Sequence, residues 1–120
     1  MPYQEDYILR MIQMLTRVLS RLFFGKDSVT YPMTDETSNG QDDPLHLRLL
    51  DLLSTRCFNE AENLLFESVE PGNLQHLAIA LDFYARLSAL DDEVLVGGGF
   101  SREETYQGLQ DIARLYGVEP

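Results

Sequence analysis

The chain has 120 residues, 44% of them hydrophobic and 24% charged, a composition that predicts one folded domain and excludes a disordered chain. Its formal net charge of −11 disfavours general nucleic-acid binding, because that affinity comes largely from Lys and Arg side chains at phosphates. Cys57 is the single cysteine, which excludes an intrachain disulfide and fits a reducing cytosol.

The charge is unevenly distributed along the sequence. Residues 1–26 carry a net charge of +2, which leaves −13 for the remainder. The charged residues of this first segment are Arg10, Arg17, Arg21, Lys26, Glu5 and Asp6. The asymmetry permits contact between the N-terminal segment and an acidic body, in one chain or between two chains. It equally permits contact with an anionic membrane surface.

The N-terminal segment has the periodicity of an amphipathic helix from Tyr3 to Phe24. Apolar residues recur at steps of three and four, which places them on one side of an α-helix. They form two adjacent seams, one of Tyr7, Met11, Met14 and Val18 and one of Ile8, Ile12, Leu15, Leu19 and Leu22, closed by Phe23. Arginines and a glutamine interrupt the apolar run, so it is neither a secretory signal nor a transmembrane span.

Residues 26–43 are predicted to be a polar linker. Asp, Ser, Thr, Asn, Gly and Gln dominate this segment, and apolar periodicity is absent from it. Val29 to Tyr31 permits a short extended piece, but one such segment does not make a sheet. The predicted organisation is therefore an N-terminal helix over 1–25, the linker over 26–43, and a helical body over 44–120, one domain in total.

Two helices joined by a tight turn are predicted after the linker. Asp43 followed by Pro44 is a helix start, because it combines an Asx cap with a proline at the first helical position. The apolar pattern breaks around Arg56 to Asn59 and then restarts, which an antiparallel pair explains better than one long rod. The apolar positions are Leu45, Leu49, Leu50, Leu52 and Leu53, then Ala61, Leu64, Leu65 and Val69.

Two further helices complete the predicted body. Asn73 is the expected cap of one helix, and Ser101 with Glu104 forms a capping box that opens the other. Gly97 to Gly99 marks a flexible turn between them. The apolar positions are Leu74, Leu77, Ala78, Leu81, Phe83, Tyr84, Ala85 and Leu87, then Tyr106, Leu109, Ile112, Ala113 and Tyr116. Five helices leave almost nothing for strands, so the predicted fold class is all-α.

The opening segment Tyr3 to Ile12, YQEDYILRMI, resembles the start of a family of short, uncharacterised proteins from low-GC Gram-positive bacteria. That family is known only as a domain of unknown function. The resemblance extends to the length, the N-terminal helix and the helical remainder. It implies a small bacterial cytosolic protein, and it brings no activity and no catalytic residues.

Residues 44–90 are similar to tetratricopeptide repeats. Phe58 followed by Ala61 is similar to the signature in which an aromatic and a small residue let paired helices approach closely. Pro71 ends the helix as in that signature, whereas Arg56 stands where the family has glycine, and the repeat spacing is a few residues short. The resemblance implies two stacked helical hairpins. The N-terminal helix then serves as a cap or a dimer contact that completes the stack.

No catalytic, metal or nucleotide motif stands out, so neither a cofactor nor an enzymatic activity is predicted. The soft metal-ligand candidates His46, His76 and Cys57 lie in different predicted helices without a paired spacing. The acidic clusters lie at helix ends or in loops, where acids are expected for capping and solvation. Gly97 to Ser101 precedes a helix as a phosphate loop does, but it lacks a lysine and a preceding strand, which favours a simple connector.

The N-terminal helix is the candidate interaction face, and three interpretations of its broad apolar side stay open. It completes the core of its own chain, it pairs with a second copy, or it binds a membrane surface through its cations and Phe23-Phe24. We expect a cytoplasmic, non-enzymatic protein-interaction module that forms a homodimer through this helix, with a membrane-anchored regulatory adaptor as the alternative. The predicted face comprises Tyr7, Ile8, Met11, Ile12, Leu15, Val18, Leu19, Leu22 and Phe23.

Overall fold

The computed structural model describes residues 2–27 and 43–119, with side chains in the first helix from Tyr7 onward. Its elements are α1 (Pro2–Phe24), α2 (Pro44–Ser54), α3 (Phe58–Ser68), α4 (Leu74–Ser88), α5 (Asp92–Gly97) and α6 (Arg102–Leu115). These described residues contain no strand, which confirms the all-α prediction. Most of the predicted linker, including the segment Val29 to Tyr31, lies outside them.

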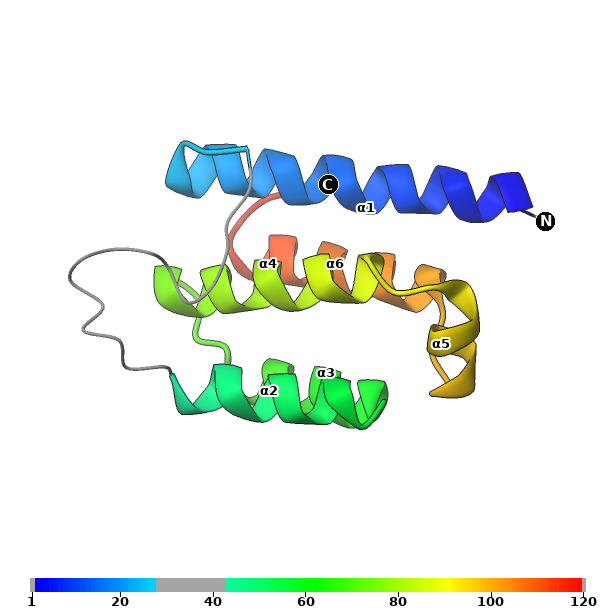
Figure 1. The fold of residues 1–120 in the computed structure, drawn as a ribbon. Coiled ribbons are helices and arrows are strands. Elements are labelled where there is room, and N and C mark those ends of the chain that lie inside the picture. The colour runs from blue at the N-terminus through cyan, green and yellow to red at the C-terminus, as the bar shows by residue number, and fades with distance from the viewer. Residues whose placement is uncertain (1, 28–42, 120) are drawn as a thin grey trace.

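The helices are arranged in layers (Figure 1). α1 lies on one side of the layer formed by α4 and α6, α2 and α3 lie on the other side, and α5 closes one end. α4 is the central helix, and all its residues from Leu77 to Tyr84 are buried. A helix that is buried around its whole circumference must be covered from both sides, and the two outer layers provide this cover.

The helix starts follow the caps that the sequence predicts. The side chains of Asp43, Asn73 and Ser101 each accept a backbone N–H from two or three residues further on, at 2.8 to 3.1 Å. These bonds satisfy N–H groups that have no partner within the helix. The predicted break between α2 and α3 is a turn in which Arg56 adopts a left-handed backbone conformation, with φ of 61°.

The predicted turn is found at Gly98 and Gly99, but a short helix that the sequence analysis did not predict, α5, comes directly before it. Gly97 belongs to α5, and Gly98 is its C-cap. A Cβ atom at Gly98 would lie 2.5 Å from the ring of Phe58, so this glycine is packed closely against the start of α3. α5 has six residues and one buried side chain, Leu95, which is too short a run to give a helical periodicity in the sequence.

α1 completes the core of its own chain. It packs along both α4 and α6, and Ile12, Leu15 and Leu19 are buried in this contact. At its end, the ring of Phe23 meets that of Tyr116 edge-on, with centroids 5.9 Å apart. The first interpretation of the apolar side is therefore confirmed for part of the helix.

Two pairs of helices pack as the predicted hairpins do, α2 against α3 and α4 against α6. The likeness of this arrangement to tetratricopeptide repeats stays a prediction. In the ranges 2–27 and 43–119, no helix combines the length and the apolar character that a bilayer crossing requires.

Candidate interaction surface

The structure divides the predicted interaction face into a buried and an exposed part. Ile12, Leu15 and Leu19 are buried, and Ile8, Met11 and Phe23 are half-buried. The exposed side chains are Tyr7 (63% exposed), Val18 (46%) and Leu22 (62%), and they are joined by Met14 (60%). The helix thus uses one side for its own core and leaves the adjacent apolar side in solvent.

We name the second side the exposed stripe, formed by Tyr7, Met11, Met14, Val18 and Leu22 of α1. Steps of three and four residues keep these side chains on one side of the helix. Four of the eight large apolar side chains that are exposed in the described part of the chain lie in this stripe. Single exposed apolar residues are normal, whereas a contiguous row of them on one helix is unusual.

The stripe faces the side of the molecule on which α6 lies. In Figure 1, α1 runs from right to left above α4 and α6, and α6 lies behind α4. The buried side of α1 faces these two helices, because it packs on them. Met14 and Val18 each precede a buried leucine by one position, and a right-handed helix turns by about 100° per residue. This rotation places the stripe at the rear of the view in Figure 1, beside α6.

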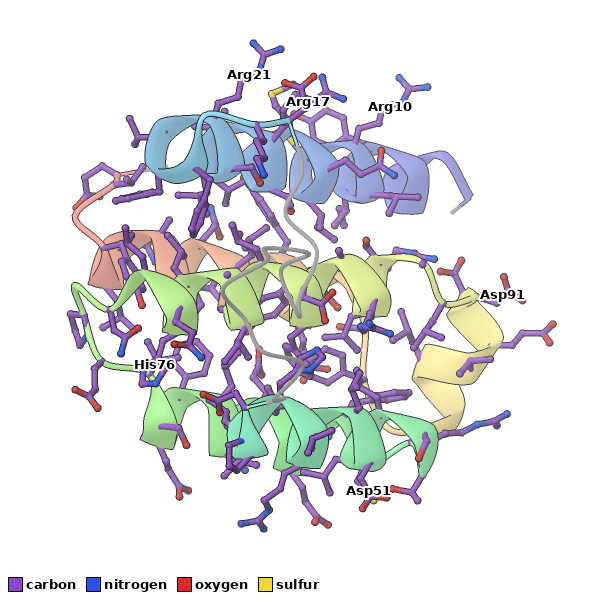
Figure 2. All side chains as sticks on the ribbon, turned by 60° about the vertical axis from the view of Figure 1, so that its left-hand side comes forward. Arg10, Arg17, Arg21, Asp51, His76 and Asp91 are labelled. Atoms are coloured by element: carbon purple, nitrogen blue, oxygen red, sulfur yellow. The ribbon has the colours of Figure 1, made fainter. Side chains whose placement is uncertain are left out.

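Three arginines border the stripe on its outer edge. Arg10, Arg17 and Arg21 point away from the helical body, as Figure 2 shows. Arg21 forms an ion pair with Asp27, and its hydrogen bond and charge lower the pKa of the Asp27 carboxyl. This row keeps the outer edge hydrated and positively charged, in contrast to the strongly acidic remainder of the chain.

A second polar feature lies in a shallow hollow of about 380 Å³ between α3 and α6. Glu62 lines this hollow, and the buried Tyr84 hydroxyl donates a hydrogen bond of 2.7 Å to its Oε2. Burial raises the pKa of the Glu62 carboxyl, and the nearby charges of Glu104 and Asp111 raise it further. Burial and the Glu62 charge also raise the pKa of the Tyr84 hydroxyl.

This carboxyl should make stability depend on pH in a defined direction. A folded-state pKa above the ordinary glutamate value of 4.5 means that the folded protein holds the Glu62 proton more tightly than the unfolded chain does. Its stabilising contribution is therefore complete below about pH 4.5 and is lost as the pH rises through the folded-state pKa. As the pH rises through this interval, the wild type should lose unfolding free energy relative to Glu62→Gln, because the variant has no carboxyl to ionise.

The measurement is urea unfolding at a series of pH values from 4 to 7, with the exposed Glu60→Gln on the same helix as control. Glu60→Gln should run parallel to wild type. If Glu62→Gln ran parallel as well, the Glu62 carboxyl would not have a raised pKa in the folded protein.

The candidate metal ligands lie apart. His46 is buried, with Nε2 2.9 Å from Oδ2 of Asp82, and this carboxylate also accepts a 2.7 Å hydrogen bond from Arg86. The imidazole of His76 accepts a backbone N–H at 3.0 Å, and Cys57 is half-buried before α3. Within the described ranges, no three His, Cys, Asp or Glu residues are grouped so that they could hold a metal ion.

The fold and this surface define a class, a small all-α protein that carries an apolar stripe on its outermost helix. The chain belongs to a family of unknown function, DUF6483, whose model matches residues 2–117. The family-level resemblance seen in the sequence is thereby confirmed, while the bacterial source stays a prediction. No curated protein and no solved structure shows a significant match.

Proposed function

We propose that this chain is a non-enzymatic, cytosolic protein-interaction module that pairs with a second copy of itself through the exposed stripe. The observation that carries the proposal is the exposure of Tyr7, Met14 and Leu22, each at least 60% accessible on a helix whose other apolar side is already buried. Burying one large apolar side chain fully contributes about 1.5–3 kcal/mol, so covering this stripe with a partner would stabilise the complex.

The spacing of the stripe favours a second copy as the partner. A symmetric dimer needs a self-complementary patch, in which residue i meets residue j and residue j meets residue i. Tyr7 and Leu22 lie equally far from a point between residues 14 and 15, and so do Met11 and Val18. In an antiparallel pair of stripes, Tyr7 of one copy therefore lies opposite Leu22 of the other, and Met11 lies opposite Val18. Met14 lies near the centre of the pair.

The first test is the mass in solution by size-exclusion chromatography with light scattering. We expect the full chain to be a dimer at tens of micromolar, and Met14→Glu/Leu22→Glu to be a monomer, because burying two carboxylates in an apolar interface is strongly unfavourable. Leu47→Glu is the matched control, since Leu47 is 49% exposed but lies on α2, in the opposite layer, and it should remain a dimer. A wild-type monomer at several hundred micromolar would refute self-association.

The outward direction of the arginine row supports a second candidate, an adaptor anchored to an anionic membrane surface. Salt separates the two candidates. Screening weakens the attraction between arginines and headgroups, whereas it leaves apolar pairing of two acidic chains unchanged or strengthened. The test is co-sedimentation with phosphatidylserine-containing vesicles at 20 and 300 mM salt, with phosphatidylcholine vesicles as control. Binding only to the anionic vesicles that is lost at 300 mM salt would support the adaptor. Absence of binding at low salt removes it.

A further inference from the structure

We propose that the two copies pair in an antiparallel arrangement, through a surface that α1 and α6 form together, with the two-fold axis passing beside Met14. This inference rests on the proposed self-association and specifies its geometry. The stripe alone is one helix wide and about 22 Å long. Such a strip is small beside the roughly 800 Å² that each partner buries in a stable dimer, so a second helix must contribute.

α6 is the helix in position to contribute. Its exposed polar row consists of Glu103, Gln107, Gln110 and Arg114, of which Gln110 is partly buried. This row lies opposite the buried side of α6, which packs on both α1 and α4, so it lies on the outer surface of the molecule. The stripe and the polar row therefore adjoin on one face of the molecule.

The two helices are also in matching register along their length. They run in the same direction (Figure 1). At one end, Ile8 lines a small hollow together with Ser101 and Arg102, and at the other end the ring of Phe23 meets that of Tyr116. The offset between contacting residues is about 93 positions at both ends, so the centre of the stripe is level with residue 108 of α6.

The polar row has its own centre at the same level. Glu103 and Arg114 lie equally far from a point between residues 108 and 109. A single two-fold axis perpendicular to the helices therefore serves both rows, with stripe against stripe and polar row against polar row. It places Glu103 of each copy opposite Arg114 of the other, a pairing of opposite charges. Arg114 already contacts Asp111 at 2.9 Å within its chain, so the three groups would form a small network.

The parallel alternative is less favourable on the same surface. A two-fold axis parallel to the helices sets the apolar stripe of one copy against the charged row of the other copy's α6. If that axis is moved toward α1 to avoid this, α6 leaves the interface and the contact becomes one helix wide. The antiparallel arrangement alone pairs apolar with apolar and acid with base.

Disulfide cross-linking under mild oxidation tests this geometry, in a Cys57→Ser background that removes the native thiol. The variants are Tyr7→Cys, Leu22→Cys and the double variant Tyr7→Cys/Leu22→Cys. Positions 7 and 22 are about 22 Å apart along one helix, so the double variant cannot close a bond within its own chain. We expect it to form covalent dimers almost completely and each single variant to form at most a few per cent.

The outcomes separate the two proposals. Efficient cross-linking of Tyr7→Cys alone and Leu22→Cys alone would show a parallel pair and overturn the antiparallel geometry, while the exposed stripe stayed the interface. If light scattering showed a dimer but no cysteine variant formed a cross-link, the interface would lie elsewhere on the molecule. A monomer by light scattering would refute the self-association itself. Unfolding curves of the reduced variants that match the Cys57→Ser background show that the substitutions leave the fold intact.

Discussion

Replacing Gly108 by alanine should lower the free energy of unfolding by about 1–3 kcal/mol, the usual range for overpacking a core. A Cβ atom at this position of α6 would collide with the Glu62 carboxylate and with the Tyr84 hydroxyl, and it would lie 2.9 Å from Cζ of the Tyr84 ring. Glu62 can swing outward, but the Tyr84 ring is fully buried and cannot move aside. The loss should exceed the gain of about 1 kcal/mol that alanine brings to a helix interior.

The matched control is Gly97→Ala in α5, where the added Cβ would meet only the Arg56 guanidinium at 4.0 Å. This variant should be neutral or slightly stabilised in urea unfolding. Removing the obstructing hydroxyl with Tyr84→Phe should recover part of the loss in Gly108→Ala/Tyr84→Phe, because the two substitutions act on one contact. Purely additive losses in the double variant would contradict the packing that we describe.

Leu19→Ala should have a still larger effect, a loss of about 2–5 kcal/mol in the free energy of unfolding. Leu19 is fully buried where α1 packs on α4 and α6, and alanine would leave a cavity that three packed helices cannot easily collapse. Differential scanning calorimetry or urea unfolding measures the loss directly.

Leu47→Ala is the control for the same chemical change at an exposed site, and it should alter stability by less than about 0.5 kcal/mol. If Leu19→Ala behaved like Leu47→Ala, α1 would not be part of the folded core. That result would also remove the distinction between the buried and exposed sides of α1 on which the proposed dimer depends.

Local sequence signals predict most of this fold because its elements begin and end with local chemistry. Three helix starts are predicted from their capping residues, Asp43, Asn73 and Ser101. The side chain of each accepts a hydrogen bond from a backbone N–H two or three residues further on, as predicted. The break at Arg56 is visible because the apolar period stops there. α5 is not predicted, because six residues with a single buried leucine show no helical periodicity of apolar residues.

The division of α1 into two sides could not be predicted from the sequence. Tyr7 and Ile8 are neighbouring residues with large, mainly apolar side chains, and the apolar periodicity does not show which one faces the body and which one faces solvent. That choice depends on where α4 and α6 lie, some 60 to 90 residues later in the chain. The contact of Tyr84 with Glu62 is hidden for the same reason, since 22 residues and a turn separate the two side chains.

The central position of α4 has a consequence for how the chain is made. Its eight consecutive buried residues need cover from α1 as well as from α2, α3 and α6. α1 is synthesised before α4 and α6, so it can pack in its final position only after α6 has been synthesised. The apolar side of α1 that packs on α4 and α6 therefore stays uncovered in a nascent chain until α6 has been synthesised.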